Sequence, residues 1–123
     1  MTEHFFNLDD LSQGIARSLA TGVTTRIFPG DQAMLSVVCL EPGRESALHS
    51  HPQEQWGVIL QGSGVRIQDG QEVAVAAGDF WRTPANIAHA FRAGPNGAQV
   101  LDVFSPPREE YRVPGAGVAS EDA

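Results

Sequence analysis

Turn-forming residues divide this sequence into short runs of apolar and β-branched side chains. The chain has 13 Gly and 8 Pro among its 123 residues. Such runs, separated by Gly, Pro, Asn and Asp, are typical of strands joined by turns. Almost no stretch has the alanine-rich or lysine-rich composition of a helix. The expected strands are residues 21–28, 33–40, 48–51, 56–60, 65–68, 71–75, 80–83, 89–92 and 99–105.

The clearest local signal is the dipeptide Asp69-Gly70, which lies between two runs of alternating side chains. An Asp-Gly pair in this setting predicts a β-hairpin with a two-residue loop. Eight or more short strands with such turns indicate an all-β fold, either a closed barrel or a double-sheet jelly roll.

The length and composition predict a single domain whose apolar residues, 41% of the chain, form a core with little to spare. Residues 1–20 are expected to be an N-terminal arm, in which residues 7–20 form either a short helix or an irregular segment. Residues 21–113 are expected to form the barrel. Residues 114–123 are small and acidic, so we expect a flexible tail.

Charge and segment composition exclude several classes of partner. The net charge of −7 argues against nucleic acid, whose partners need a basic face. No apolar run is long enough to span a membrane, and the first ten residues do not resemble a signal peptide. The single cysteine, Cys39, excludes a disulfide within the chain. We therefore expect a soluble cytoplasmic protein.

His49 and His51 are separated by one residue in a segment that we expect to be extended. Side chains two residues apart on such a segment share a face, so the two imidazoles would be presented together. The pair alone is a weak signal, because two solvated histidines in a loop have the same spacing. Metal binding is favoured by Gln55, by Gly62 and by a third histidine, His89, further along the chain.

With these residues in place, the chain resembles the cupin superfamily, whose fold is a double-stranded β-helix, a jelly-roll barrel. The first cupin motif is matched in spacing by Gly43, His49, His51, Gln55 and Gly62. Gln55 stands where the family usually has a glutamate. The second motif is matched by Gly78, Pro84, Asn86, His89 and Ala93. Asn86 and Ala93 depart from the family's glycine and asparagine.

A narrower resemblance is to the KdgF family, small cupins of pectin and alginate breakdown that open 4,5-unsaturated uronates to linear keto acids. It rests on the sequence His-Ser-His-Pro-x-Glu-Gln and on residues 101–111. The resemblance implies that the metal ligands are His49, His51, Gln55 and His89. It further implies that the residues acting on the sugar are Asp102, Phe104 and Arg108.

Three neutral imidazoles and one amide oxygen form a ligand set without charge. A divalent metal would keep its full charge there, attract an anion and act as a Lewis acid. Ni, Zn, Fe, Mn and Co all suit such a set. An oxygenase site with two histidines and one carboxylate would need a glutamate at position 55. Glu54 is one residue away and would point to the opposite face of a strand.

Asp102 and Phe104 are two residues apart on the last expected strand and share a face. If that face is the barrel interior, Asp102 can transfer protons beside the metal. The alternative is that Asp102 faces outward and pairs with an arginine. Phe104 packs either on the sugar ring or in the core. Arg108 either binds a substrate carboxylate or forms an ion pair at the rim with Glu109 or Glu110.

Five other residues have weaker assignments. A cavity-facing Arg66 or Arg82 would help to hold an acid. Trp56 and Trp81 are expected in the core or in a dimer contact, unless they line a pocket. Tyr111 could close the mouth of the cavity.

The first hypothesis for function is a metal-dependent enzyme acting on a small acidic sugar, most specifically by ring opening of a 4,5-unsaturated uronate. The second is a cupin-type dioxygenase with ferrous iron, and the third is a non-catalytic cupin that binds a metal or small molecule. The expected partner is a small carboxylate or sugar acid. By resemblance, we also expect a homodimer that pairs through its N-terminal strand and outer sheet, near Phe5 and Phe6.

Overall fold

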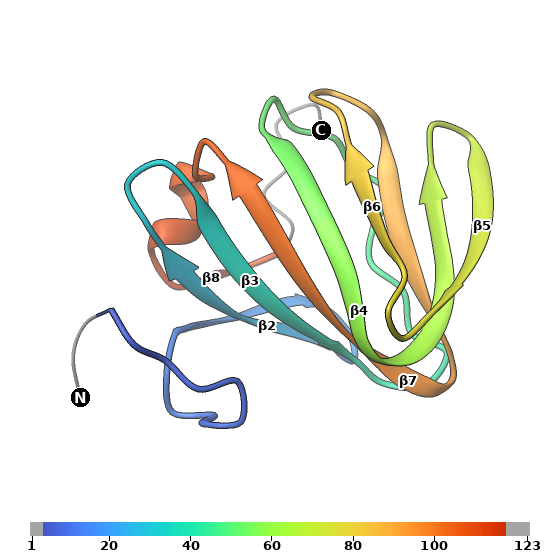
Figure 1. Cartoon of the computed structure of the whole chain (residues 1–123), viewed down its shortest axis with the longest axis horizontal. Helices are drawn as coiled ribbons and strands as arrows, with labels where there is room; N and C mark the ends of the chain where they lie inside the picture. Colours follow the sequence, from blue (N-terminus) through green and yellow to red (C-terminus); the bar gives the residue numbers. More distant parts are fainter. Residues whose placement is uncertain (1–3, 118–123) are drawn as a thin grey trace.

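A computed structural model of the chain describes residues 4–117, which fold almost entirely into strands (Figure 1). The expectations for residues 1–3 of the arm and 118–123 of the tail lie outside the described residues. The elements are β1 (Ile15–Ala20), β2 (Val23–Pro29), β3 (Met34–Leu40), β4 (Glu54–Gln68), β5 (Gln71–Ala76), β6 (Phe80–Thr83), β7 (His89–Ser105), the 3-10 helix η1 (Glu109–Arg112) and β8 (Gly115–Ala116).

The strands form one sheet in the order β5-β4-β7-β3-β2-β1-β8, and β6 pairs with β4. Figure 1 shows β2 and β3 on one side and β5 and β6 on the other, while β7 bends at the base and contributes to both sides. The predicted jelly-roll barrel in a single domain is confirmed. No helix among residues 4–117 is long and apolar enough to cross a membrane.

β4 and β7 are each longer than the sequence indicated. We expected a break at residues 61–64 and another at 94–97, but both strands continue through their glycines. The pairing of β4 with β7 shifts register between Ile59 and Gln61 and again between Gly62 and Gly64. Glycine permits such bulges, which bend a strand without ending it. The glycines therefore mark bends that carry both strands from one side of the barrel to the other.

The expectation of a helix or an irregular segment over residues 7–20 is wrong for its second half. Ile15–Ala20 is strand β1, which pairs antiparallel with β2. An inward-facing Arg17 hides the alternation of this strand, because a buried arginine takes a position that is usually apolar. Its guanidinium donates to the backbone carbonyls of Glu110, Ala116 and Gly117. The start of the expected tail is consequently ordered as β8, parallel to β1.

The predicted hairpin at Asp69-Gly70 is confirmed, since both residues have positive φ, 51° and 78°. Two groups of buried apolar side chains form the core. One contains Val23, Val38, Leu40, Ile59, Phe91, Ala93 and Val100, and the other contains Ile27, Met34, Phe104 and Tyr111. Members of both groups line a shared cavity, so the core walls also shape the site.

We expect Gly62→Ala to destabilise the fold more than Gly43→Ala. Both glycines have positive φ, 84° and 72°, which costs an alanine about 1–3 kcal/mol. A Cβ at Gly62 would also collide with the carbonyl oxygen of Gly97, whereas a Cβ at Gly43 meets nothing within 4 Å. The collision should cost a further 1–3 kcal/mol or so. Urea unfolding of both variants measures the difference. Equal losses in the free energy of unfolding would contradict the close approach of Gly62 to Gly97.

Candidate metal centre

The structure brings His49, His51 and His89 together at one end of the barrel. His49 precedes β4 and His89 begins β7, and their backbones exchange two hydrogen bonds of 3.0 and 2.9 Å. The side chains converge so that one ligand nitrogen from each histidine lies within 4.8 Å of the others. His51 and His89 are buried, and His49 is partly buried. Three residues from two separate segments therefore meet at one point.

Backbone carbonyls fix the orientation of all three rings. Each Nδ1 lies at hydrogen-bond distance from a carbonyl oxygen, 2.8 Å for His49, 3.1 Å for His51 and 2.8 Å for His89. A carbonyl only accepts, so the proton is assigned to Nδ1 and the Nε2 lone pair is free to bind a metal. Nε2 of His89 is buried and has no hydrogen-bond partner among the described residues. This unpartnered lone pair fits a metal ion.

Burial keeps the three imidazoles neutral. It lowers the pKa of His49 to about 4 and that of His89 to about 2, and it lowers the pKa of His51 as well. The guanidinium of Arg108 lowers the pKa of His49 and His51 further, and that of Arg66 acts mainly on His89. A metal binds the neutral imidazole, so at neutral pH the cluster needs to release no proton.

Gln55 lies beside this cluster on β4 and is 3% exposed. Its Oε1 is 3.0 Å from Nε2 of His51, and its side chain also hydrogen-bonds Asp102. An ionised carboxylate only accepts, so the amide nitrogen faces Asp102 and the oxygen faces His51. Oε1 and Nε2 then both present lone pairs, and a cation between them makes this close approach favourable. A divalent metal fits this arrangement of nitrogen and oxygen donors.

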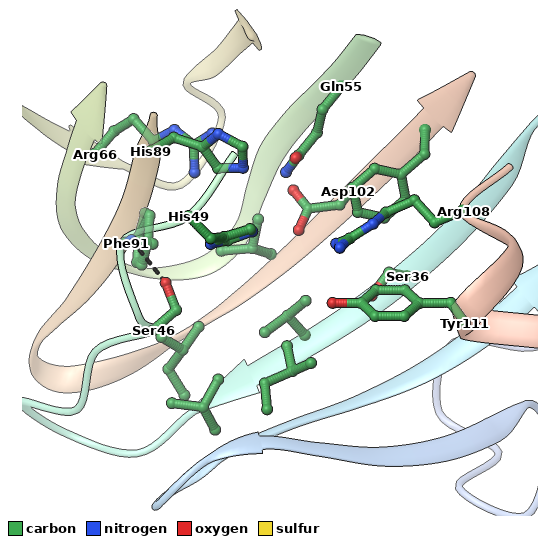
Figure 2. A pocket seen from close by; sticks show the side chains of 16 residues that line it. Ser36, Ser46, His49, Gln55, Arg66, His89, Phe91, Asp102, Arg108 and Tyr111 are labelled. Atoms are coloured by element: carbon green, nitrogen blue, oxygen red, sulfur yellow. Dashed lines mark hydrogen bonds between the residues drawn. The ribbon is translucent and has the colours of Figure 1, made fainter. Parts of the chain in front are cut away.

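Asp102 and Phe104 both face the interior of the barrel, so the alternative of an outward Asp102 is excluded. Figure 2 shows the Asp102 carboxylate pointing toward Gln55. Burial raises the pKa of Asp102 to about 6, against the opposing effect of the Arg66 charge. The Phe104 ring packs edge-on against His51, with centroids 5.5 Å apart. The cavity therefore combines a carboxylate of perturbed pKa with an aromatic wall.

Arg108 is 1% exposed and lines the same cavity. Its guanidinium lies 4.2 Å from the centroid of the Tyr111 ring and 5.5 Å from that of Phe104. At the surface nearby, Glu109 pairs with a different arginine, since Arg112 Nε lies 2.9 Å from Glu109 Oε1. Arg108 thus lies in the cavity wall, where aromatic faces stabilise its charge.

Further polar residues line the cavity (Figure 2). Arg66 is buried and donates to Thr83 Oγ1 at 2.7 Å, whereas Arg82 is exposed. Tyr111 also lines the cavity, as the sequence suggested. Ser36 and Ser46 line it too, and the sequence analysis did not predict them. A signal for Ser36 existed, because it interrupts an apolar run at a position that shares a face with Met34 and Val38.

A double-stranded β-helix with three convergent histidines at one end defines the class of metal-binding cupins. The cupin domain profile matches residues 36–104, more than half of the chain. The protein therefore belongs to the cupin domain family.

Comparisons with individual proteins agree on the fold. Oxalate decarboxylase OxdC from Bacillus subtilis is 34% identical over an alignment of 91 residues, which covers 69% of this chain and 24% of that protein. The chain thus spans about a quarter of that relative. An RmlC-like cupin from Shewanella frigidimarina superposes with a TM-score of 0.78 at 24% identity, covering 89% and 96% of the two chains. KdgF from Halomonas sp. gives 0.77 at 23% identity, covering 89% and 98%.

We expect His89→Ala to abolish most of the stabilisation that Zn²⁺ or Ni²⁺ gives to the wild-type protein. Metal at 100 times its Kd stabilises a folded protein by about 2.7 kcal/mol, which should raise Tm by roughly 10 °C for a chain of this size. Differential scanning fluorimetry with metal and with EDTA measures the effect. His4→Ala is the control, since His4 is exposed and outside the cluster. Equal metal-dependent shifts in both variants would contradict the assignment.

Proposed function

We propose that this protein is a metal-dependent cupin enzyme that acts on a small acidic sugar, most specifically by opening the ring of a 4,5-unsaturated uronate. The observation that carries the proposal is that Asp102 and Arg108 line the same cavity as His49 and His89, two of the three clustered histidines. An acid–base group, a carboxylate-binding group and a metal cluster are the parts that this reaction requires. The overall similarity to KdgF from Halomonas sp. supports it.

The proposed metal ligands are His49, His51, His89 and Gln55. None of them carries a charge, so a bound divalent cation would supply a Lewis acid of undiminished charge that favours an anionic substrate. The hydrogen bond from Gln55 to Asp102 couples this ligand set to the acid–base group. The orientation of the Gln55 amide is thereby fixed, and with it the position of its oxygen.

The proposed reaction is an isomerisation in which one proton leaves the anomeric hydroxyl and one is delivered to C4. As the hydroxyl loses its proton, the bond from C1 to the ring oxygen breaks and an aldehyde forms. The ring oxygen remains on C5 as an enolate, which becomes a ketone when C4 is protonated. Asp102 takes the first proton and delivers the second. Its raised pKa suits both directions of transfer.

Phe104 and Arg108 position the substrate in this proposal. The Phe104 ring provides a flat apolar surface for the sugar, and the Arg108 guanidinium forms paired hydrogen bonds with the carboxylate. The proposal also includes a homodimer, supported by the exposed Phe5, Phe6 and Leu11 of the N-terminal segment.

We expect Asp102→Asn to lower kcat by a hundredfold or more, since general acid–base groups contribute about 10²–10⁴ in rate. The metal-loaded protein is mixed with freshly generated 4,5-unsaturated galacturonate, and the loss of ultraviolet absorbance of the conjugated double bond is followed. Asp31→Asn, which changes an exposed aspartate, should leave the rate unchanged. Turnover by Asp102→Asn at the wild-type rate refutes the proton-transfer role, and no acceleration by the wild type refutes the proposed function.

We expect Arg108→Lys to raise KM about tenfold while kcat changes less. Lysine keeps the charge but cannot form the paired hydrogen bonds of a guanidinium. The same assay over a range of substrate concentrations separates the two constants. Arg112→Lys is the matched control, because Arg112 lies four residues away and pairs with Glu109 at the surface. An unchanged KM in Arg108→Lys would show that another group binds the carboxylate.

A second candidate function is favoured by the 34% identity to an oxalate decarboxylase. In this case the same cavity would bind a small carboxylic acid and release CO2 from it. Measuring CO2 from oxalate under the metal conditions of the uronate assay distinguishes the two candidates. Oxygen uptake in the same experiments tests the dioxygenase hypothesis.

A further inference from the structure

We propose that Trp81 is a positioning residue for Asp102, and that its indole N–H is hydrogen-bonded to Asp102 Oδ1 directly or through one water molecule. The contact itself is independent of the reaction. Its catalytic consequence rests on the proposed function, in which Asp102 moves protons.

The three residues concerned form one row across the sheet. Gly57 on β4 pairs with Trp81 on β6 and with Asp102 on β7. Residues directly opposite one another in antiparallel strands project to the same face. Trp81 and Asp102 therefore flank Gly57 on the inner face of the barrel.

Gly57 leaves the space between these two side chains open. A Cβ built on Gly57 would lie 2.7 Å from Trp81 Nε1 and 2.8 Å from Asp102 Oδ1. The two polar atoms thus lie close to the same glycine, one on the side of β6 and the other on the side of β7. Even a methyl group at position 57 would separate them.

The two atoms complement each other chemically. Trp81 Nε1 and Asp102 Oδ1 are both buried, and neither has a hydrogen-bond partner among residues 4–117. An indole N–H is a donor only, and an ionised carboxylate oxygen is an acceptor only. Leaving both unpaired is costly, whereas a small shift or one bridging water satisfies both.

The surroundings of Trp81 hold its ring in place. The ring stacks on Phe91 with centroids 5.9 Å apart and an interplanar angle of 23°. The guanidinium of Arg66 lies 5.2 Å from the Trp81 ring centroid, and Arg66 is itself held by Thr83. Trp81 can therefore fix Asp102 Oδ1, while the hydrogen bond from Gln55 reaches the other carboxylate oxygen.

The chain contains two tryptophans, and the second is an internal control. Trp56 is half-exposed, and its Nε1 donates to Glu54 Oε2 at 2.9 Å. A ¹H–¹⁵N correlation spectrum should show two indole signals, which Trp81→Phe and Trp56→Phe assign. We expect Asp102→Ala to shift only the Trp81 signal and to speed its solvent exchange about tenfold or more, while Glu54→Ala shifts only the Trp56 signal. A Trp81 signal that Asp102→Ala leaves unchanged in shift and exchange overturns the proposal.

The activity assay tests the positioning role separately. Trp81→Phe keeps an aromatic ring for Phe91 and Arg66 but lacks the N–H. We expect kcat to fall on the order of tenfold, with KM within about twofold, because a misplaced acid–base group slows the chemical step. Trp56→Phe should match the wild type. Unchanged kcat in Trp81→Phe overturns the positioning role. If the wild type has no uronate activity, the proposed function fails, and the indole signals alone decide whether Trp81 holds Asp102.

Discussion

The pairing of β4 with β7 is the constraint on which the site depends. This ladder places Gln55 opposite Phe104 and Gly57 opposite Asp102, and it sets His89 opposite Gln68 at its other end. Alternate residues of a strand face opposite sides, so a shift of one residue in β7 would turn His89, Asp102 and Phe104 away from the cavity. The two bulges absorb the bend at the glycines and preserve the inward face on both sides of them. A single pairing therefore builds both the barrel and its polar interior.

The backbone around the histidines prepares them for a metal before any ion is present. Each Nδ1 is engaged by a main-chain carbonyl, and burial disfavours protonation of Nε2. The rings are therefore held in one tautomer and one orientation. Gln55 is held in the same manner, since Asp102 binds its amide nitrogen. Hydrogen bonds that hold the ligand side chains in place raise the affinity of a site, because less conformational entropy is lost when the metal binds.

The sequence allowed much of this site to be predicted, because its spacing and its alternation are local. The shared face of His49 and His51 and that of Asp102 and Phe104 follow from such patterns, whereas the approach of His89 was implied only by the cupin resemblance. Strand β1 was not predicted because Arg17 occupies an inward position that is usually apolar. Strands β4 and β7 were each predicted as two shorter strands, because a glycine can either end a strand or bend it. The row of Gly57, Trp81 and Asp102 joins three strands. It depends on register, which no local pattern reveals.

Two buried guanidiniums, of Arg66 and Arg108, act on the histidine cluster, while the ligands proposed there carry no charge. A divalent cation entering this site meets repulsion from these guanidiniums, which the negative charges of Asp102 and Glu110 oppose. A bound acid would relieve that repulsion, so the metal and the acid should bind cooperatively. Thermodynamic linkage makes the coupling reciprocal. The bound acid raises the affinity for the metal by the same factor by which the bound metal raises the affinity for the acid. The protein would then retain its metal most firmly when such an acid is abundant.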